Sequence, residues 1–381
     1  MLTSLVNGMQ ISIPRSLEGV APVSPNNLDF AYEPYCWLGL DAVLGEGGIA
    51  YDAGAAHGLM SVMMRKRVGE RGKVHAFEAN PSTLPVTREV LSANGCEVVL
   101  SNLCVGDASG GEADFYCAPG LDAVASSRNV KIAAKFPGAQ RIRVPLVALD
   151  DYAAQHSHTP AVIKLDIEGS EHLAVKGARR IMERSHPHWV IETHPEQMGE
   201  GTSLVGMCEL LEHSGYELFD LYNGTAIRGR DYAKQHERKF GYLMACVRIP
   251  EGLRDRHRQL KARFADRERQ EQTMVEARRL AGADPSRAVR LLRIVLAETP
   301  GLAEAHYLLA FSLQALRSET GAAIAHYETA LRLGFDPFWV RYNLGALLFD
   351  SGERDAAREQ MLMARELDPA HEGVRFYLNQ L

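Results

Sequence analysis

The stretch Ile-Ala-Tyr-Asp-Ala-Gly-Ala-Ala-His-Gly at residues 49–58 decides the fold of this chain. A short apolar run ends at Asp52, and Gly54 follows two residues later. Gly58 then precedes a helix-forming run that begins at Leu59. This order predicts a strand, a tight glycine turn and the first turn of a helix. Such a turn brings backbone N–H groups and a helix N-terminus close to a ligand.

The spacing of this motif is D-x-G-x-x-x-G. The dinucleotide fingerprint is G-x-G-x-x-G, in which the glycines make room for a pyrophosphate. A carboxylate at Asp52, two residues before the first glycine, repels a pyrophosphate and attracts an ammonium or a sulfonium group. We therefore predict that Asp52, Gly54, Ala55 and Gly58 bind S-adenosylmethionine. An NAD(P)-linked oxidoreductase is the alternative that the glycine spacing disfavours.

Size and composition limit the class of protein. A chain of 381 residues predicts two domains, each long enough to bury a core. The formal net charge of −6 argues against nucleic acid or an anionic membrane as the main partner. No apolar run approaches the roughly 20 residues of a membrane span. The N-terminus has no secretion signal, and the six cysteines form no C-x-x-C pair, so we expect a cytoplasmic protein with reduced thiols.

Apolar runs alternate with helical patterns over residues 46–250, which predicts a mostly parallel sheet with helices on both faces. The last two predicted strands, 216–220 and 239–247, lack a helix between them, which allows an antiparallel edge. Residues 1–45 are interpreted as an irregular arm with a lead-in helix at 36–45. The other expected strands are 73–78, 98–102, 161–165 and 188–192, and the other expected helices are 82–94, capped by Ser82, 171–184 and 204–214.

Beyond Pro250 the strand patterns end and the composition turns to Ala, Leu, Arg and Glu. Residues 251–269 are interpreted as a helical linker. A repeat of about 34 residues follows: Ala323 and Ala330 recur as Ala357 and Ala364. This pattern resembles the tetratricopeptide repeat over residues 270–371, with 372–381 as a capping helix, and a plain helical bundle is the alternative. Such an array implies a protein partner or self-association.

Glu78 ends the second predicted strand, about 25 residues after Asp52. In this architecture a carboxylate at that strand tip accepts hydrogen bonds from both ribose hydroxyls. The competing interpretation of Glu78 is a helix cap or a solvated turn residue. We expect Ala79 and Asn102 to lie beside the cofactor. We place Gly106 and Asp107 at the adenine edge, with a surface turn as the alternative.

A second motif, Ile-Lys-Leu-Asp-Ile-Glu-Gly, occupies residues 163–169. Alternation puts Lys164, Asp166 and Glu168 on one side if the strand continues. Burying such groups costs several kcal/mol unless they are paired. We expect Asp166 and Glu168 at the mouth of the cleft, beside the methyl group to be transferred. An internal ion pair followed by a helix start is the alternative.

At this point the chain resembles the FkbM-type methyltransferase family over roughly residues 45–247. The resemblance implies a Rossmann-like class I fold with a mostly parallel seven-stranded sheet, S-adenosylmethionine as cofactor, and mostly O-methylation of hydroxyls on natural products or sugars. Ala79 stands where the family often has proline, and His57 where it often has a small polar or aliphatic residue. The motifs that carry it are Asp52-Ala-Gly-Ala55, Ala76-Phe-Glu-Ala-Asn-Pro81, Leu149-Asp-Asp151, Ile163-Lys-Leu-Asp-Ile-Glu-Gly-Ser-Glu171 and Ile191-Glu-Thr-His194.

Methyl transfer to a hydroxyl benefits from a base that removes the proton. The candidates for this base are Asp166, Glu168, Glu192 and His194, and His194 has a suitable ordinary pKa. We also expect Lys164 to belong to the catalytic residues. The same four residues could instead hold Mg²⁺, but no local metal motif favours that mechanism. The acceptor is expected to be a small or carrier-bound molecule. A non-catalytic scaffold, in which only the repeats function, is a further alternative.

Two further segments are candidates for the acceptor pocket. A loop at 120–140, with Ser126, Ser127, Arg128 and Lys131, would close over the acceptor, unless it is an ordinary excursion between strands. Tyr32, Tyr35 and Trp37 would line the pocket from the arm, unless they are plain packing.

Overall fold

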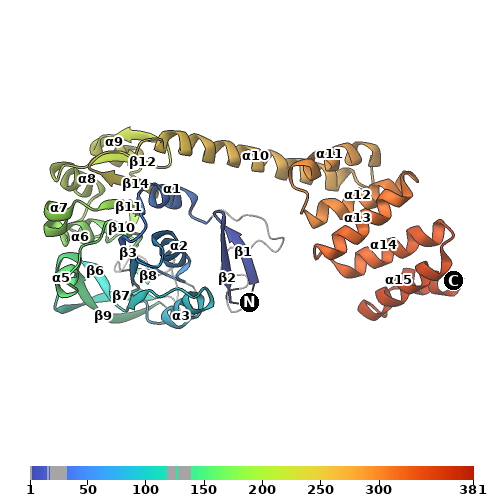
Figure 1. Cartoon of the computed structure of the whole chain (residues 1–381), viewed down its shortest axis with the longest axis horizontal. Helices are drawn as coiled ribbons and strands as arrows, with labels where there is room; N and C mark the ends of the chain where they lie inside the picture. The colour runs from blue at the N-terminus through green and yellow to red at the C-terminus, as the bar shows by residue number, and fades with distance from the viewer. Residues whose placement is uncertain (1, 15–16, 18–31, 118–125, 128–138) are drawn as a thin grey trace. The chain divides into compact units, whose positions relative to one another are not determined.

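The computed structural model describes residues 2–14, 17, 32–117, 126–127 and 139–381 (Figure 1). The described residues form two compact units that divide between Leu260 and Lys261. This division falls inside helix α10 (Leu253–Leu280), which runs unbroken past residue 270, where we expected the repeats to begin. Each unit is described by itself below.

The first unit is built on an eight-stranded sheet in the order β13-β12-β14-β11-β10-β3-β4-β5. The five strands from β11 to β5 are parallel to one another, and β14 is antiparallel to both of its neighbours. The expectation of seven strands is wrong because the short strand β13 adds an edge. The strands are β3 (Ile49–Ala53), β4 (Lys73–Phe77), β5 (Val99–Ser101), β10 (Val162–Leu165), β11 (His188–Thr193), β12 (Glu217–Asp220), β13 (Thr225–Ile227) and β14 (Gly241–Cys246).

Helices cover both faces of this sheet (Figure 1). Ala50, Val162 and Val190 pack on one side with α1, α2 and α3, while Ile163 and Ile191 pack on the other with α5 to α9. Strand alternation therefore directs Lys164 toward the α1 and α2 side. The helices are α1 (Pro34–Val43), α2 (Leu59–Val68), α3 (Leu84–Ala93), α5 (Leu149–Gln155), α6 (Glu171–Lys176), α7 (Arg179–Ser185), α8 (Leu204–His213) and α9 (Gly229–Gln235).

A second sheet, in the order β6-β9-β7-β8, is inserted between β5 and α5. It buries a small apolar cluster of its own, made by Cys104, Ala113, Phe115 and Val144. Its strands are β6 (Cys104–Gly106), β7 (Gly111–Cys117), β8 (Ser126–Ser127) and β9 (Gln140–Ala148). Most of the loop proposed to close over the acceptor, including Arg128 and Lys131, lies outside the described residues.

The irregular arm expected at the N-terminus is wrong in part, because its first residues form a hairpin. Strand β1 (Leu2–Val6) pairs antiparallel with β2 (Met9–Ile13). The two residues between them, Asn7 and Gly8, have φ values of 47° and 80°. An Asn-Gly pair with both residues at positive φ is the preferred two-residue hairpin turn. The Asn-Gly pair is thus a local sequence signal for this hairpin.

Three local expectations also need correction. Ser82 does not cap α3: its N–H and hydroxyl donate to the side chain of Asn80 instead. The single helix expected over 171–184 is two helices, because the chain turns at Gly177, where a Cβ would overlap the carbonyl oxygen of Gly106. A short helix, α9, does separate β12 from β14, although the antiparallel edge itself is confirmed.

The second unit consists of helices whose starting points recur. Helix α12 begins at Ala303 and α14 at Pro337, 34 residues later, and α13 and α15 begin at Thr320 and Arg354, also 34 residues apart. Gly352, at the turn between α14 and α15, has a φ of 83°. The helices that follow α10 are α11 (Pro285–Glu298), α12 (Ala303–Ala315), α13 (Thr320–Arg332), α14 (Pro337–Asp350), α15 (Arg354–Leu367) and α16 (Glu372–Gln380).

Small buried residues let these helices approach one another. Ala323, Ala330, Ala357 and Ala364 are fully buried at matching positions of α13 and α15. Asn343 on α14 donates from Nδ2 to the hydroxyl of Tyr307 on α12, at 2.9 Å, and so ties one helix pair to the next. The 34-residue period of the sequence is thus also the period of the helices.

Replacing Ala357 with leucine should destabilise the second unit. The side chain is fully buried, so three added carbons would force α15 away from its neighbours. Overpacking of this kind costs about 1–3 kcal/mol. Chemical denaturation followed by circular dichroism measures it. Glu359→Leu, on the exposed side of the same helix, is the control. Equal stability of the two variants would contradict this packing.

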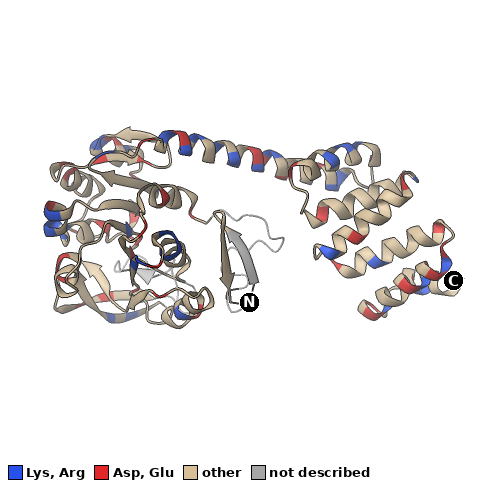
Figure 2. Ribbon diagram, viewed as in Figure 1, with Lys and Arg blue, Asp and Glu red and all other residues tan. Residues whose placement is uncertain are grey.

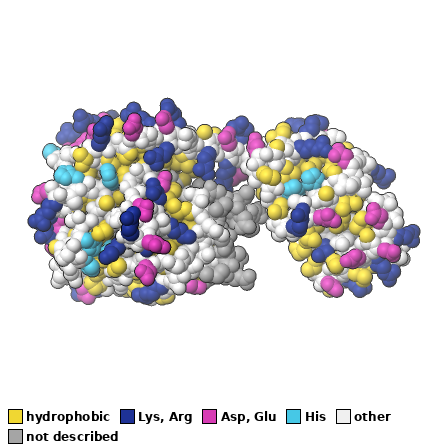
Figure 3. Space-filling model, in the orientation of Figure 1, with side chains coloured by type: hydrophobic (Ala, Val, Ile, Leu, Met, Phe, Trp, Pro, Cys, Tyr) yellow, Lys and Arg dark blue, Asp and Glu magenta, His cyan; other side chains and the backbone are white. Residues whose placement is uncertain are grey.

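Charges of both signs are interspersed over the surface. Lys and Arg alternate with Asp and Glu along α10, and both signs are scattered over the visible face (Figures 2 and 3). Of the helices described, none combines the length and apolar character needed to span a bilayer. None of the six cysteines, all in the described part of the chain, forms a disulfide.

Candidate functional site

The carboxyl ends of the parallel strands bring the two sequence motifs together. Gly54 follows β3, Glu78 follows β4, Asp166 follows β10 and His194 follows β11. Because neighbouring parallel strands end at the same edge of the sheet, these residues lie along one edge. This is where ligands bind in open α/β sheets.

The glycine turn after β3 is held against the neighbouring strands. Gly54 and Ala55 both donate their N–H groups to the carbonyl oxygen of Phe77. Gly54 has a φ of 83°, and a Cβ there would overlap the carbonyl oxygen of Asp166. Gly58, with a φ of 81°, is the N-cap residue of α2, and a Cβ there would lie 2.9 Å from the methyl group of Thr87. Both positions therefore require glycine, and the turn brings its backbone close to the strand tips.

Glu78 is buried with both carboxylate oxygens engaged. Oε2 accepts from the N–H of Ala56 at 2.8 Å, and Oε1 accepts from the N–H of Asn80 at 2.7 Å. Burial raises the pKa of Glu78 to about 7, although the two backbone donors oppose that shift. These bonds orient the carboxylate and leave lone pairs on each oxygen for further donors.

Asn102 supports the same loop from β5. Its Nδ2 donates to the carbonyl oxygens of Glu78 and Ala79, at 2.8 and 3.0 Å. Gly106 lies elsewhere: it belongs to the second sheet and packs against Gly177 after α6. Asp107 is exposed and acts electrostatically on His172 of α6. The structure thus joins Asn102 and Ala79 to the Glu78 loop, and places Gly106 and Asp107 beside α6.

Asp52 does not lie open to a ligand, contrary to our expectation. It is fully buried, and its oxygens meet the hydroxyl of Ser61, which donates at 2.5 Å, and Nζ of Lys164, at 3.2 Å. The cause is the register of the sheet, which pairs Lys164 of β10 directly with Asp52 of β3. The ammonium that Asp52 attracts in this structure is that of Lys164.

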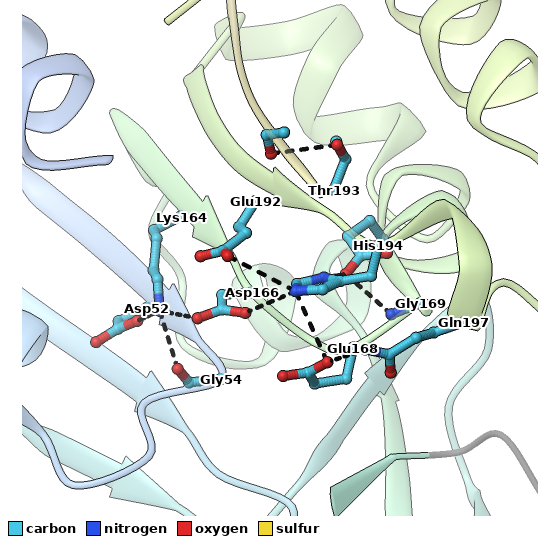
Figure 4. Close-up of polar contacts among 12 residues, drawn as sticks. Asp52, Gly54, Lys164, Asp166, Glu168, Gly169, Glu192, Thr193, His194 and Gln197 are labelled. Atoms are coloured by element: carbon cyan, nitrogen blue, oxygen red, sulfur yellow. Dashed lines mark hydrogen bonds and ion pairs between the residues drawn. The ribbon is translucent and has the colours of Figure 1, made fainter. Parts of the chain in front are cut away.

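Lys164 ties the two motifs together. Its Nζ donates to the carbonyl oxygen of Gly54 at 2.9 Å and lies 3.5 Å from Oδ2 of Asp166 (Figure 4). Burial by itself lowers the pKa of Lys164, but the carboxylates of Asp52 and Asp166 outweigh burial and hold that pKa well above its ordinary range. The internal ion pair that sequence reasoning held as the alternative is therefore present, together with an Asp166 side chain that is 20% exposed.

His194 lies among the carboxylates of Asp166, Glu168 and Glu192 (Figure 4). Together with Glu171, which contacts the other side of the ring, these residues form what we call the acidic cluster. The ring is 9% exposed, and its Nδ1 lies 2.9 Å from Oε1 of the fully buried Glu171. Nε2 faces the other three carboxylates, 3.8 Å from Asp166, 3.7 Å from Glu168 and 3.8 Å from Glu192.

The carboxylates around His194 argue against this residue as the base that takes the proton from the acceptor. Burial by itself lowers the pKa of His194, but the hydrogen bond to Glu171 and the nearby carboxylates outweigh it and raise the pKa to about 10. An imidazolium has no lone pair with which to accept a proton. The ordinary pKa on which the expectation rested does not apply here.

Two carboxyl groups of the cluster hold protons more tightly than usual. Burial raises the pKa of Glu168 to about 7, and burial together with Asp166 raises that of Glu192 to about 9. Glu168 does not continue the strand, since β10 ends at Leu165 and Glu168 has a φ of 50°. Its Oε2 accepts from the side-chain amide of Gln197. A base works best when its pKa is near the working pH, which favours Glu168.

Sequence reasoning missed several residues of the site. Ser61 and Gln197 carry no motif, and only the fold brings them to Asp52 and Glu168. Glu171 was part of a quoted motif but received no role. Glu33 lies in the presumed irregular arm, yet its carboxylate forms a group with those of Asp166 and Glu192. The half-buried Tyr32 and Tyr35 pack against the core that α1 and α2 share, alongside the buried Trp37.

Comparisons with known proteins come from one family model and from solved structures. Residues 52–218 match the family model described as methyltransferase FkbM domain. No curated protein matches this chain. The structure of methyltransferase FkbM from Methylobacillus flagellatus KT is 18% identical, with 52% of this chain and 43% of that chain covered and a TM-score of 0.34. This chain thus spans less than half the length of that relative.

Two other solved structures are similar at lower identity. Precorrin-6y C5,15-methyltransferase from Geobacter metallireducens is 13% identical, with 63% of this chain and 94% of that chain covered and a TM-score of 0.33. Fibrillarin from Aeropyrum pernix, in complex with natively bound S-adenosyl-L-methionine, is 12% identical, with 54% and 68% covered and a TM-score of 0.31. Residues 52–218, which lie within the first unit, are thus similar to the methyltransferase FkbM domain.

Proposed function

We propose that the first unit transfers a methyl group from S-adenosylmethionine to a hydroxyl of a small molecule, a sugar or a natural product, free or carrier-bound. The observation that carries this proposal is the Glu78 carboxylate, oriented by two backbone N–H groups beside the Gly54 turn. It has the position and the free acceptor capacity that a ribose with two adjacent hydroxyls requires.

The residues present fit this cofactor. Glu78 would accept from the ribose hydroxyls, and the turn at Gly54, where any Cβ would clash, leaves room for close backbone approach. Asp166 and the cluster carboxylates would balance the positive charge of the sulfonium and the ammonium. When bound, S-adenosylmethionine supplies an electrophilic methyl group, and the fold holds the acceptor in line with it.

On the acceptor side we assign the proton transfer to Glu168 or Glu192. Both have raised pKa values, and both lie within 4 Å of His194 Nε2. His194, fixed by Glu171, acts as a positioning residue that holds these carboxylates together. Lys164 orients Asp166 rather than reacting itself.

Calorimetry on the full chain tests the proposal. S-Adenosylmethionine and S-adenosylhomocysteine should bind, and NAD⁺ should not. Glu78→Ala should weaken S-adenosylhomocysteine about 100-fold, since two charge-assisted hydrogen bonds of roughly 1.5 kcal/mol each are lost. Glu112→Gln, an exposed position in the second sheet, is the control. Binding of NAD⁺ without either adenosyl ligand overturns the proposal. An activity test completes the experiment: mass spectrometry should detect transfer of a deuterated methyl group from labelled S-adenosylmethionine to a hydroxyl acceptor.

Affinity for S-adenosylhomocysteine should depend on pH through Glu78. Its pKa lies near 7 in the folded protein, so lowering the pH from about 8 to about 6 protonates the carboxylate and removes an acceptor. We expect affinity to be level above about pH 8 and to fall toward tenfold per pH unit below about pH 7. Glu78→Gln cannot titrate and should show weaker binding with a flat profile. A flat wild-type profile would contradict this role.

We propose that residues 270–381 form a tetratricopeptide-like array for association with a protein or with a second copy of this chain. The 34-residue recurrence of the helix starts and the small buried residues of α13 and α15 support this assignment. Sedimentation analysis over a range of chain concentrations tests self-association, which Ala357→Leu should weaken and Glu359→Leu should not.

A further inference from the structure

His194 is held in the manner of a metal ligand. One ring nitrogen, Nδ1, is bonded to the buried carboxylate of Glu171, and the other, Nε2, faces three more carboxylates. In almost all histidines that bind metals, the other ring N–H donates a hydrogen bond to a carboxylate, a carbonyl or water. This hydrogen bond fixes the orientation of the ring and its tautomer. At 3.7–3.8 Å, the distances from Nε2 to those carboxylates are too long for hydrogen bonds.

The spacing of these atoms suits a common ion. One ligand atom each from Asp166, Glu168 and His194 lie within 4.8 Å of one another. Two ligand atoms that are each about 2.1 Å from a shared ion lie about 3.0–3.6 Å apart. The present distances from Nε2 to Asp166 and Glu168 exceed that range by only a few tenths of an ångström, while the carboxylate oxygens of Asp166 and Glu168 lie within 4.8 Å of each other. Closing the site therefore requires these two carboxylates to rotate toward the ion.

An independent observation lies on the other side of Asp166. Glu33, at the start of α1, forms a second group with Asp166 and Glu192, again within 4.8 Å. Its Oε2 is shielded from solvent and has no hydrogen-bond partner among the described residues. A buried carboxylate oxygen without a donor is costly. Since Lys164 is already bonded to Asp52 and Gly54, the carboxylates outnumber the cations around them.

We propose that this cluster is a site for one divalent metal ion, bound by Asp166, Glu168 and His194, with Glu171 as the positioning residue behind His194. Binding of the ion at Nε2 displaces the proton that this nitrogen carries in the metal-free protein and releases it to solvent. An imidazole among carboxylates suits Mn²⁺ or Zn²⁺ better than Mg²⁺, which prefers oxygen and water. The role of the ion rests on the proposed function: it would polarise the acceptor hydroxyl and lower its pKa.

Mn²⁺ alone is the probe, added to chelator-treated full-length protein without cofactor. Electron paramagnetic resonance counts the free ion, and we expect one Mn²⁺ bound per chain, at least tenfold tighter than Mg²⁺ in competition. Pulsed measurements on the wild type should show coupling of bound Mn²⁺ to one imidazole nitrogen. This signature needs no variant, so it does not depend on how a substitution folds. Absence of Mn²⁺ binding, or of the nitrogen coupling, overturns the proposal.

The Mn²⁺ affinities of single variants distinguish the proposed metal-site residues from carboxylates elsewhere on the protein. Glu168→Gln should weaken Mn²⁺ at least 10-fold, and Glu171→Gln, behind His194, about 10–100-fold. Glu112→Gln makes the same change at an exposed site and should leave Mn²⁺ affinity unchanged. Equal Mn²⁺ affinity in Glu168→Gln and Glu112→Gln refutes the site.

S-Adenosylhomocysteine binding is measured on the same metal-free samples. Cofactor binding without Mn²⁺ binding overturns the metal site alone. Mn²⁺ binding without cofactor binding overturns the proposed function and supports the metal site.

Discussion

Gly54→Ala should abolish cofactor binding and strongly destabilise the first unit. The new Cβ would overlap the carbonyl oxygen of Asp166, and the φ of 83° is itself unfavourable for alanine. Gly54 and Asp166 directly follow the paired ends of β3 and β10, so neither can move without opening the sheet. We expect a loss of about 4 kcal/mol in the free energy of unfolding, the size typical of strain at a special backbone position.

Gly110→Ala is the control that separates the effect of the steric clash from the cost of placing alanine at a positive φ. Gly110 has a φ of 85°, and a Cβ there meets nothing within 4 Å. That variant should lose only about 1–2 kcal/mol, the cost of placing alanine in the left-handed region. Denaturant unfolding measures both, and calorimetry with S-adenosylhomocysteine measures binding. If the two variants lose equal stability, the close approach of Gly54 to Asp166 is wrong.

Lys164→Met should strongly lower the free energy of unfolding of the first unit. It leaves the carboxylate of Asp52, which has no exposure to solvent, without its cation. Removing one partner of a buried ion pair costs about 3–5 kcal/mol, because the remaining charge is uncompensated. The exposed Lys234→Met is the control and should stay within about 0.5 kcal/mol of the wild type.

A double variant tests whether the cause is the stranded charge. Asp52→Asn removes the carboxylate, so Asp52→Asn with Lys164→Met should recover about 2 kcal/mol relative to the sum of the single losses. Urea unfolding of the four proteins closes the cycle. Strict additivity would show that Lys164 stabilises the fold by packing rather than by pairing with Asp52.

Some features could be predicted because their signals are local. The strand before Asp52, the turn at Gly54 and Gly58, and the buried strand before Asp166 follow from short-range pattern and backbone preference. The signal for the hairpin at Asn7 and Gly8 is equally local. The single helix expected over 171–184 is two helices that break at Gly177, where the backbone approaches the carbonyl oxygen of Gly106 too closely for any side chain.

The sequence by itself determined the alternation of strands and helices, the glycine turn and the carboxylates at the strand ends. Only the tertiary structure decided which charges meet. Register pairs Lys164 with Asp52, and the meeting of β10, β11 and α6 surrounds His194 with carboxylates that raise its pKa. The reason is physical: electrostatic interactions depend on distance and burial between residues far apart in the chain, which no local pattern encodes.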